Sequence, residues 1–374
     1  MATSPLSPEA REKMLNLPAS SPPPNVKPNF VNPSSVAFSA ECALHGLYAL
    51  STIMFFIKAY AQVWIDRKKD LESCVVAVAW IVYTGAFQPV GVLLARAPMG
   101  VHQRDITFRQ FGRYLFLQYT LLVIWGILVL LLKITILLQY LRVFVPHGSR
   151  NFTFWASHVL LYTNIVYYVA FTFLQIFSCS PREKWWDKTI MEGHCIDIFA
   201  VNVSGAVVCL VSDLAILCIP QGVVTKLNLP RSKIVGLCAL FAIGVFACVT
   251  SAVRVYYNVR LWQSQVDVTH QLSYMSFWGT AQLPAAFLVV CLPSVPKVFN
   301  HVRTKPWCAR LETWLRPAAK VPAEKAPTAR QIVTIGGGAN GQQKATVVSD
   351  AEFRDLMATD RTSVSTTSHV HTMA

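Results

Sequence analysis

The amino-acid sequence predicts an all-α polytopic membrane protein, a bundle of seven transmembrane helices. Of its 374 residues, 53% are hydrophobic and only 14% are charged, whereas soluble domains average roughly 45–50% and about 25%. The mean hydropathy of +0.42 excludes a single soluble core, because a soluble surface needs far more charge to cover it. The charges are also confined to short clusters separated by long apolar segments.

Each of these apolar segments reaches the roughly 20 residues that an α-helix needs to cross about 30 Å of hydrocarbon. The second, fourth, sixth and seventh contain no Asp, Glu, Lys or Arg in their interiors. Pro89 and Pro284 lie inside segments but do not argue against helices, because neighbouring helices satisfy the freed backbone groups. The predicted spans are approximately 42–64, 73–95, 114–138, 154–177, 197–219, 234–254 and 273–295.

The chain outside the bundle divides into two tails and a linking segment. Residues 1–38 and 317–374 lack apolar periodicity and are rich in Pro, Gly, Ser or Thr, so we expect disordered tails around a membrane domain at 39–300. Residues 301–316 place two tryptophans and two leucines on one helical face, which predicts an amphipathic helix lying on the membrane. Cys308 within it is either a palmitoylation site or an ordinary thiol.

The distribution of Lys and Arg predicts the orientation. The formal net charge is +14, and with so few charges per residue we expect the partner of this basic surface to be the lipid bilayer rather than nucleic acid. Thirteen basic residues fall on the side of the C-terminus and ten on the other side, where Arg254 is counted as a loop residue. This excess predicts a plasma-membrane protein with its N-terminus outside and its C-terminus in the cytosol.

The polar loop between the fourth and fifth spans begins at Cys179 and ends at Cys195. With the N-terminus outside, this loop faces the oxidising side of the membrane, where disulfides persist. We therefore expect a Cys179–Cys195 disulfide, the alternative being two free thiols.

Two ionisable residues inside spans are candidates for an intramembrane ion pair, because burying an unpaired charge in lipid costs at least about 2.5–3.5 kcal/mol. Lys133 lies nine residues before Arg142, and Asp213 lies seven residues before Pro220. At about 1.5 Å per residue, both belong to the inner half of the bilayer at similar depths. For Lys133 the alternative is snorkelling to the headgroups. The side chain of Asp213 is too short for that, and its alternative is a proton-binding role.

Other polar residues within spans have more ordinary interpretations. Lys58 precedes a basic cluster, and we expect its long side chain to snorkel to the headgroups. Asn164, Asn202 and Gln282 lie in the middle of spans, where such groups more often form interhelical hydrogen bonds than ligand contacts.

The sequence has no signature of a cofactor or of catalysis. Covalent retinal needs a lysine in the last helix, and residues 271–296 contain none, so we expect no cofactor. Residues 336–341, GGGANG, match the dinucleotide pattern formally, but the tail is too short for the βαβ unit that would use it. The chain also lacks HExxH, GxSxG, a P-loop and paired CxxC motifs, so we expect neither an enzyme nor a metal site.

Four motifs point to a family. The third span ends in KITILLQYLRVF, the following polar loop contains IFSCSPREKWW and EGHC, the fifth span contains VSDLAILCIP, and the seventh ends in CLPSVPKVF. Over residues 45–300 the chain resembles the fungal rhodopsin-like seven-helix integral membrane proteins, which include receptor-like proteins of filamentous ascomycetes linked to host-surface sensing. Two departures exist: Lys69 to Glu72 replace paired aspartates before the second span, and Gln282 replaces a glutamate in the seventh.

The resemblance implies a receptor-like sensor of surface or environmental cues. In this hypothesis a small or hydrophobic ligand in an outer or central cavity shifts a two-state helix arrangement, which is passed to a cytosolic partner such as a heterotrimeric G protein. Arg142 would form the signalling face at the cytosolic mouth, and phosphates on Ser and Thr at 362–368 would change partner docking. The alternative function is a membrane transporter or proton-coupled channel in which Asp213 carries protons, although no inverted repeat is evident.

Overall fold

The computed structural model describes residues 8–21, 29–30, 37–67, 70–145, 151–224 and 231–303. Seven of its helices are long and apolar enough to cross a membrane, which confirms the predicted all-α bundle. All seven predicted spans are present and differ from the prediction mainly in length. In the structure they run over Phe38–Asp66, Leu71–Arg96, Phe108–Val143, Phe152–Ile176, Ile198–Gln221, Gly236–Gln263 and Val268–Arg303.

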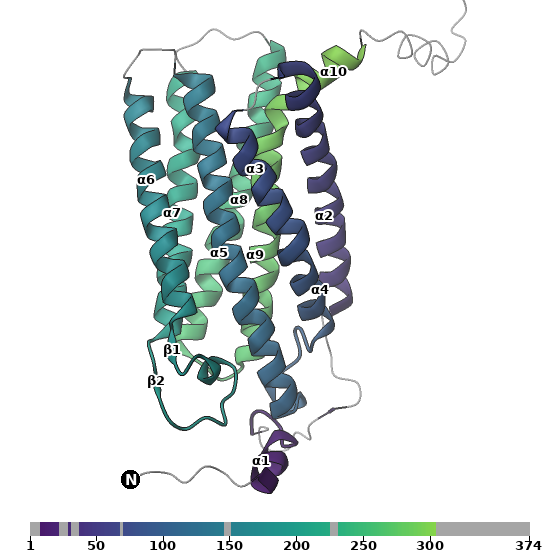
Figure 1. The fold of residues 1–374 in the computed structure, drawn as a ribbon, viewed down its shortest axis with the longest axis vertical. Helices are drawn as coiled ribbons and strands as arrows, with labels where there is room; N and C mark the ends of the chain where they lie inside the picture. The colour runs from purple at the N-terminus through teal and green to yellow at the C-terminus, as the bar shows by residue number, and fades with distance from the viewer. Residues whose placement is uncertain are drawn as a thin grey trace, which may run out of the picture. The chain divides into compact units, whose positions relative to one another are not determined.

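Figure 1 shows these helices side by side, with the short α1 at one end and α10 at the other. The helices are α1 Pro8–Leu15, α2 Ala37–Tyr60, α3 Leu71–Val82, α4 Gln88–Arg96, α5 Phe108–Phe144, α6 Phe152–Ile176, α7 Ile198–Val224, α8 Arg231–Gln263, α9 Val268–Cys291 and α10 Val295–Arg303. Shorter elements are η1 Ala61–Asp66, η2 Tyr83–Phe87, η3 Gln103–Asp105, η4 Arg182–Trp185 and η5 Leu292–Ser294, with strands β1 Cys179–Ser180 and β2 His194–Cys195.

Helices α5 and α9 form the centre of the bundle and carry about half of the buried apolar side chains among the described residues. Helix α5 begins at a capping box, in which the Thr107 side chain accepts from the Gln110 backbone N–H and the Gln110 side chain accepts from the Thr107 N–H. These two bonds satisfy backbone groups that a helix start otherwise leaves unpaired. The apolar length of this helix and its cap together explain why it runs unbroken through the bundle.

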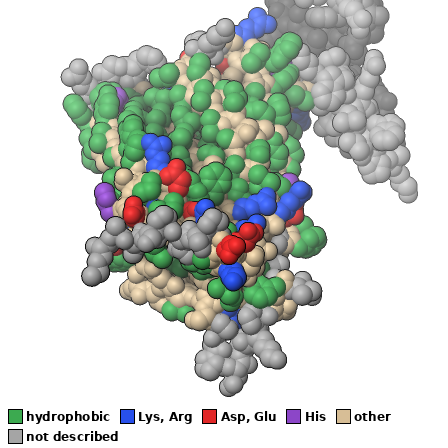
Figure 2. Space-filling model, turned by 60° about the horizontal axis from the view of Figure 1, so that its bottom comes forward, with side chains coloured by type: hydrophobic (Ala, Val, Ile, Leu, Met, Phe, Trp, Pro, Cys, Tyr) green, Lys and Arg blue, Asp and Glu red, His purple; other side chains and the backbone are tan. Residues whose placement is uncertain are grey.

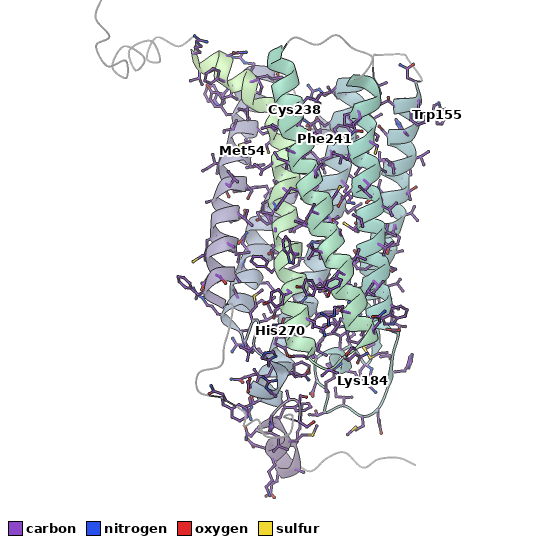
Figure 3. The ribbon with its side chains drawn as sticks, turned by 180° about the vertical axis from the view of Figure 1, so that it is seen from behind. Met54, Trp155, Lys184, Cys238, Phe241 and His270 are labelled. Carbon is purple, nitrogen blue, oxygen red and sulfur yellow. A yellow bond between two sulfur atoms is a disulfide. The ribbon has the colours of Figure 1, made fainter. Side chains whose placement is uncertain are left out.

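The side of the bundle is covered by hydrophobic side chains, whereas charged side chains gather at the end that Figure 2 turns toward the reader. Ile53 and Phe56 on α2 and Val166 on α6 are more than half exposed. Trp155, near the start of α6, points away from the bundle (Figure 3) and is 57% exposed. Such an apolar exterior fits hydrocarbon, and an exposed tryptophan near a helix end fits the membrane interface.

The second span is continuous but contains a π-helical turn, η2, directly before Pro89. Proline lacks an N–H and crowds the preceding turn, so a wider turn accommodates it without ending the helix. Tyr83 and Phe87 in this turn are each 1% exposed and pack in the central cluster of the core.

The two ends of the bundle differ in what they carry. The disulfide end, as we name it, holds β1, β2 and α1, and the opposite α10 end holds α10 and the α2–α3 connection (Figure 1).

Helix α1 corrects the expectation that residues 1–38 are disordered throughout. Arg11 pairs with Asp187 at 2.7 Å, and Ala19 donates a backbone hydrogen bond to Ile106. These polar contacts give the segment partners that its composition does not reveal.

The seventh span ends with α10 at Arg303, and the chain that follows lies outside the described residues. Most of the predicted amphipathic helix at 301–316, with Cys308, therefore lies outside the described residues. The predicted tail at 317–374, including positions 336–341 and 362–368, lies outside them as well.

Candidate functional site

The structure brings Lys133 of α5 and Asp213 of α7 together inside the bundle, which agrees with the similar depths predicted for them. The Lys133 Nζ lies 2.9 Å from Asp213 Oδ1, with 5% and 13% of the two side chains exposed. Lys133 also donates to the Cys209 carbonyl at 3.1 Å and to the Ser212 hydroxyl. Its ammonium therefore finds three acceptors on α7 and does not reach toward headgroups.

The other oxygen of Asp213 binds two further helices. Its Oδ2 accepts from the Ser251 hydroxyl of α8 at 2.6 Å and from the Gln282 Nε2 of α9 at 2.9 Å. Gln282 Nε2 also lies 2.8 Å from Ser251 Oγ and 3.2 Å from Cys209 Sγ. One carboxylate thus joins α5, α7, α8 and α9, and we name Lys133, Asp213, Ser251 and Gln282 the central network.

Gln282 has a clear role here that explains one departure from the family pattern. A glutamate at this position would bring a second carboxylate against Asp213, and two acids that close disfavour joint ionisation. The amide of Gln282 instead donates to Asp213. The interhelical hydrogen bond predicted for Gln282 is therefore present in the structure.

The other two predicted interhelical groups, Asn164 and Asn202, differ in where they form hydrogen bonds. Asn164 is 2% exposed, but its Nδ2 donates to the Leu160 carbonyl of its own helix at 2.7 Å, which corrects the expectation of an interhelical bond. A short amide side chain can reach the carbonyl one turn back, and that local bond competes with a partner on another helix. Asn202 does bond between helices, because its Oδ1 accepts from Gln175 Nε2 at 2.5 Å.

A cavity with about 60 Å³ of space for the centres of water-sized molecules borders the central network. Its polar wall is formed by Lys133, Asp213 and Gln282, and the rest is mainly aliphatic. The apolar wall comes from α5, α7, α8 and α9, and includes Leu132, Ile136, Leu217, Leu240, Ala247 and Ala286. We name this space the central cavity, and it extends from the network toward the α10 end.

A second ionic cluster lies at the α10 end, and it corrects the prediction that Lys58 snorkels. Lys58 is 2% exposed, and its Nζ lies 2.5 Å from Glu72 Oε1 and 3.1 Å from the Val290 carbonyl. Because a carboxylate and a carbonyl meet the ammonium inside the bundle, it stays buried. Arg142 joins the same cluster, with its Nη1 2.5 Å from Asp70 and 3.7 Å from Glu72.

Arg254, which the charge distribution along the sequence places in a loop, is a buried charge in the structure. Arg254 lies within α8, nine residues before that helix ends at Gln263, and is 4% exposed. Its Cζ lies 3.6 Å from the ring centroid of Trp125. The stretch from Val255 to Trp262 is apolar except for Asn258 and Arg260, and it is the signal that would have extended this helix beyond the predicted boundary.

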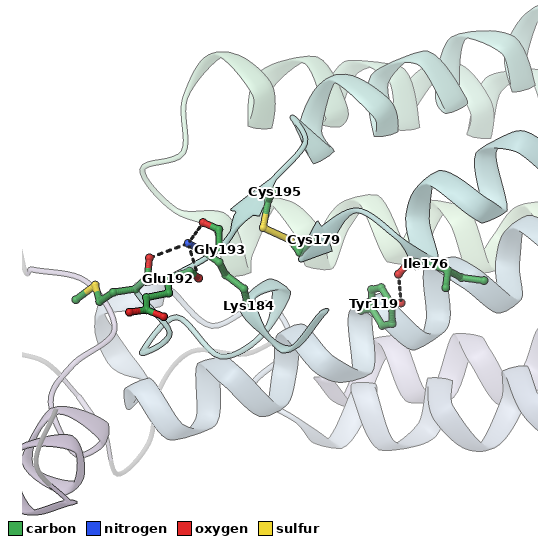
Figure 4. Close-up of a disulfide and its surroundings, with 8 residues drawn as sticks. Tyr119, Ile176, Cys179, Lys184, Glu192, Gly193 and Cys195 are labelled. Carbon is green, nitrogen blue, oxygen red and sulfur yellow. Dashed lines mark hydrogen bonds between the residues drawn. A yellow bond between two sulfur atoms is a disulfide. The ribbon is translucent and has the colours of Figure 1, made fainter. Parts of the chain in front are cut away.

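The predicted disulfide between Cys179 and Cys195 is confirmed, and it joins β1 to β2 (Figure 4). The loop between the strands closes on Lys184, whose Nζ donates to the carbonyls of Met191, Glu192 and Gly193 at 2.8–3.1 Å. An ammonium has three donors, so one side chain satisfies three consecutive carbonyls of the loop.

Gly193 is required by the close approach of the two strands. Its φ is +90°, and a Cβ built there would lie 2.1 Å from the Ser180 carbonyl oxygen. Only glycine combines this backbone conformation with that approach at little cost. The glycine two residues before Cys195 therefore shapes the loop so that the two cysteines meet.

An ion pair between Asp187 and Arg11 connects the same loop to α1. Partial burial alone would raise the pKa of Asp187, but hydrogen bonds from Thr189 and the charge of Arg11 outweigh it and hold the pKa below its ordinary value. Asp187 Oδ1 accepts from the Thr189 N–H at 3.0 Å, and Oδ2 accepts from Arg11. The carboxylate form is thus the one that the folded loop favours.

Within the described ranges, no group of three or more His, Cys, Asp or Glu side chains is arranged to hold a metal ion. The fold and the site together define a multi-pass membrane protein of seven helices with a charged network and a cavity inside its bundle.

The chain belongs to the fungal rhodopsin domain family, whose sequence model matches residues 57–301. It is 28% identical over 291 residues to fugralins biosynthesis cluster protein 2 of Gibberella zeae, covering 77% of this chain and 72% of that protein. It is 34% identical over 202 residues to a SAT4 family membrane protein of Emericella nidulans, covering 54% and 50%. Receptor GIN3 of Arthrobotrys oligospora is 23% identical over 267 residues, covering 69% and 62%. No solved structure matches this chain.

The Gly193→Ala variant tests the strand approach. We expect the fraction of Cys179–Cys195 disulfide to fall, because the new methyl group meets the Ser180 carbonyl and a positive φ costs a non-glycine residue about 1–3 kcal/mol. Peptide mass spectrometry under non-reducing conditions measures the linked fraction. The control is Met191→Ala in the same loop. The Met191 residue is 63% exposed, so this change should leave the linked fraction unchanged.

A double-mutant cycle tests the central ion pair. Lys133→Met or Asp213→Asn alone leaves one buried group without its counter-charge, which typically destabilises by about 3–5 kcal/mol. We expect the double variant to be less destabilised than the sum of the two single variants. Thermal unfolding of the purified protein in detergent provides the measurement, and strictly additive losses would contradict the pairing.

Proposed function

We propose that this chain is a receptor-like sensor of the fungal membrane, with the central cavity as its ligand site. The observation that carries the proposal is the contact between this cavity and the Lys133–Asp213 pair. A ligand in the cavity touches the one carboxylate that joins α5, α7, α8 and α9, so its binding can favour one packing of these helices over another. The aliphatic wall suits a small, largely hydrophobic ligand.

Support for a sensor also comes from a relative. Receptor GIN3 of Arthrobotrys oligospora is named as a receptor and matches 69% of this chain. A seven-helix fold alone does not define a function, so the relative adds to the argument from the cavity and does not replace it.

In this proposal the disulfide end faces the outside and the α10 end faces the cytosol. The disulfide favours the oxidising side for its loop. Arg254 lies inside the bundle and leaves the count of loop cations, whereas Arg11 and Lys13 of α1 join it on the disulfide side. The count becomes eleven on the disulfide side against thirteen on the other, and the direction of this small excess agrees with the positive-inside rule.

The proposed signalling face is the ionic cluster at the α10 end. Arg142 on α5 holds Asp70 and Glu72 at the start of α3, and Lys58 on α2 binds the same Glu72. A relative movement of α5 and α3 would open these contacts toward a cytosolic partner, for which a heterotrimeric G protein is the first candidate.

A second candidate function is transport. The observation that favours it is the position of Asp213, a carboxylate bordering a cavity inside the bundle. Intramembrane carboxylates of this kind serve as proton relays in transporters. One of the relatives is named for a fugralins biosynthesis cluster, and a small metabolite is a fitting cargo or ligand in either function.

A reporter of G-protein dissociation in cells that express the chain separates the two functions. Surface-derived hydrophobic compounds and cutin-like monomers are applied, and we expect at least one to give a saturable response. Ala247→Phe should abolish that response, because it fills the central cavity from α8. Ala242→Phe, on the exposed side of the same helix, is the matched control.

Equal surface amounts of both variants are verified with an epitope tag. A response that Ala247→Phe leaves intact would place the ligand elsewhere. Silence with every compound, together with proton flux in proteoliposomes that Asp213→Asn removes, would favour transport instead.

The same reporter tests the signalling face. Arg142→Gln should raise the ligand-free signal, because it removes the contacts with Asp70 and Glu72 that hold α5 against α3. The Arg142 side chain is 44% exposed, so the contact is worth about 1 kcal/mol at most and the rise should be several-fold. Asp70→Asn removes the partner and should act in the same direction, whereas opposite effects would argue against this role.

A further inference from the structure

Arg254 is the buried charge for which the described part of the chain supplies no counter-charge. The other buried cations are Lys58, which pairs with Glu72, and Lys133, which pairs with Asp213. No ion pair includes Arg254 among the described residues, and the carboxylate of the central network is already bound by Lys133 and Gln282. A guanidinium stays charged at any ordinary pH, so it cannot escape the problem by losing a proton.

The hydrogen-bond donors around Arg254 are unsatisfied as well. Arg254 Nε and Nη1 and Trp125 Nε1 are buried without a partner. All three are N–H groups, which donate and cannot accept. The Arg254 Cζ lies 3.6 Å from the centroid of the Trp125 ring, so the ring contacts the guanidinium but leaves its Nε and Nη1 without hydrogen bonds. A group that satisfied these donors would have to be an acceptor.

A cavity with about 20 Å³ of space for the centres of water-sized molecules opens at this place, and we name it the Arg254 cavity. Its wall contains Arg254 of α8, Trp125 and Gln118 of α5, and Ser276 and Gly279 of α9. Gly279 makes the room, because a Cβ there would already lie 3.4 Å from Arg254 Nε. About 10–15 Å³ of such space holds one water molecule, so the occupant of this cavity is small.

We infer that the Arg254 cavity binds a small monovalent anion, either a halide or the carboxylate of a small organic acid. Such an anion neutralises the unpaired guanidinium and accepts the hydrogen bonds that Arg254 and Trp125 leave unmade. Water would accept these bonds but would leave the buried positive charge uncompensated. The site is distinct from the central cavity, and the inference holds whether or not the chain signals to a G protein.

Thermal unfolding of the purified full-length protein in detergent tests this inference. Sodium chloride, sodium acetate and sodium gluconate are compared at one ionic strength, gluconate being too bulky for the cavity. We expect chloride or acetate to raise the unfolding temperature saturably, by a few degrees over gluconate. A response to chloride assigns a halide site, and a response to acetate without chloride assigns a carboxylate site. Equal unfolding temperatures in all three salts would overturn the inference.

Variants of α8 and α9 locate the effect. Arg254→Gln should remove the difference between the salts, whereas Arg260→Gln should retain it. Arg260 is the matched control because it lies on the same helix with the same charge, but is exposed beside Tyr256. Gly279→Ala keeps the charge and narrows the cavity, so it should raise the concentration for half-maximal stabilisation. Loss of the salt response in Arg260→Gln as well would overturn the assignment.

Fluorescence provides a readout that does not require Arg254→Gln to fold. Iodide bound in the cavity lies beside the Trp125 ring and should quench it in a saturable manner, in addition to collisional quenching of exposed tryptophans. Chloride or acetate should compete with this component, and Trp125→Phe should remove it. Quenching by iodide that shows no saturable component in the wild-type protein would overturn the inference.

Discussion

The hydrogen-bonded ion pair of Lys133 and Asp213 is the interaction on which the middle of this bundle depends. The outer surface of the helices is apolar and suits hydrocarbon, where no water is available to solvate a charge. A charged group in the interior is therefore costly unless it finds a partner inside the bundle. Asp213 finds Lys133, Ser251 and Gln282, and these contacts bring α5, α7, α8 and α9 into one register.

The same requirement organises the two halves of the bundle on either side of the network. Toward the α10 end lie the central cavity and the cluster of Lys58, Glu72 and Arg142, in which each charge has a partner. Toward the disulfide end, Arg254 lies one helical turn beyond Ser251 on α8, in contact with Trp125 beside its own cavity. A ligand in either cavity would act on helices that the central network already couples.

The residues that carry the family resemblance have structural reasons for their identity. Cys179 and Cys195 close the loop, and Gly193 is the residue that permits the strands to approach. Lys133 and Asp213 form the central pair. The departure at Gln282 is compatible with the same network, because an amide donates to Asp213 where a second carboxylate would oppose it. These motifs thus describe contacts that hold the helices and the loop in place.

From its sequence alone, this chain determines seven spans and the similar depths of Lys133 and Asp213 within them, because apolar length and helical rise follow from local chemistry. Lys133 and Asp213 were therefore predictable as a pair. Only the tertiary structure decided that Lys58 meets Glu72, that Asn164 bonds within its own helix and that Arg254 lies inside the bundle. Those outcomes depend on how each helix is rotated against its neighbours, and that rotation is set by packing across the whole bundle.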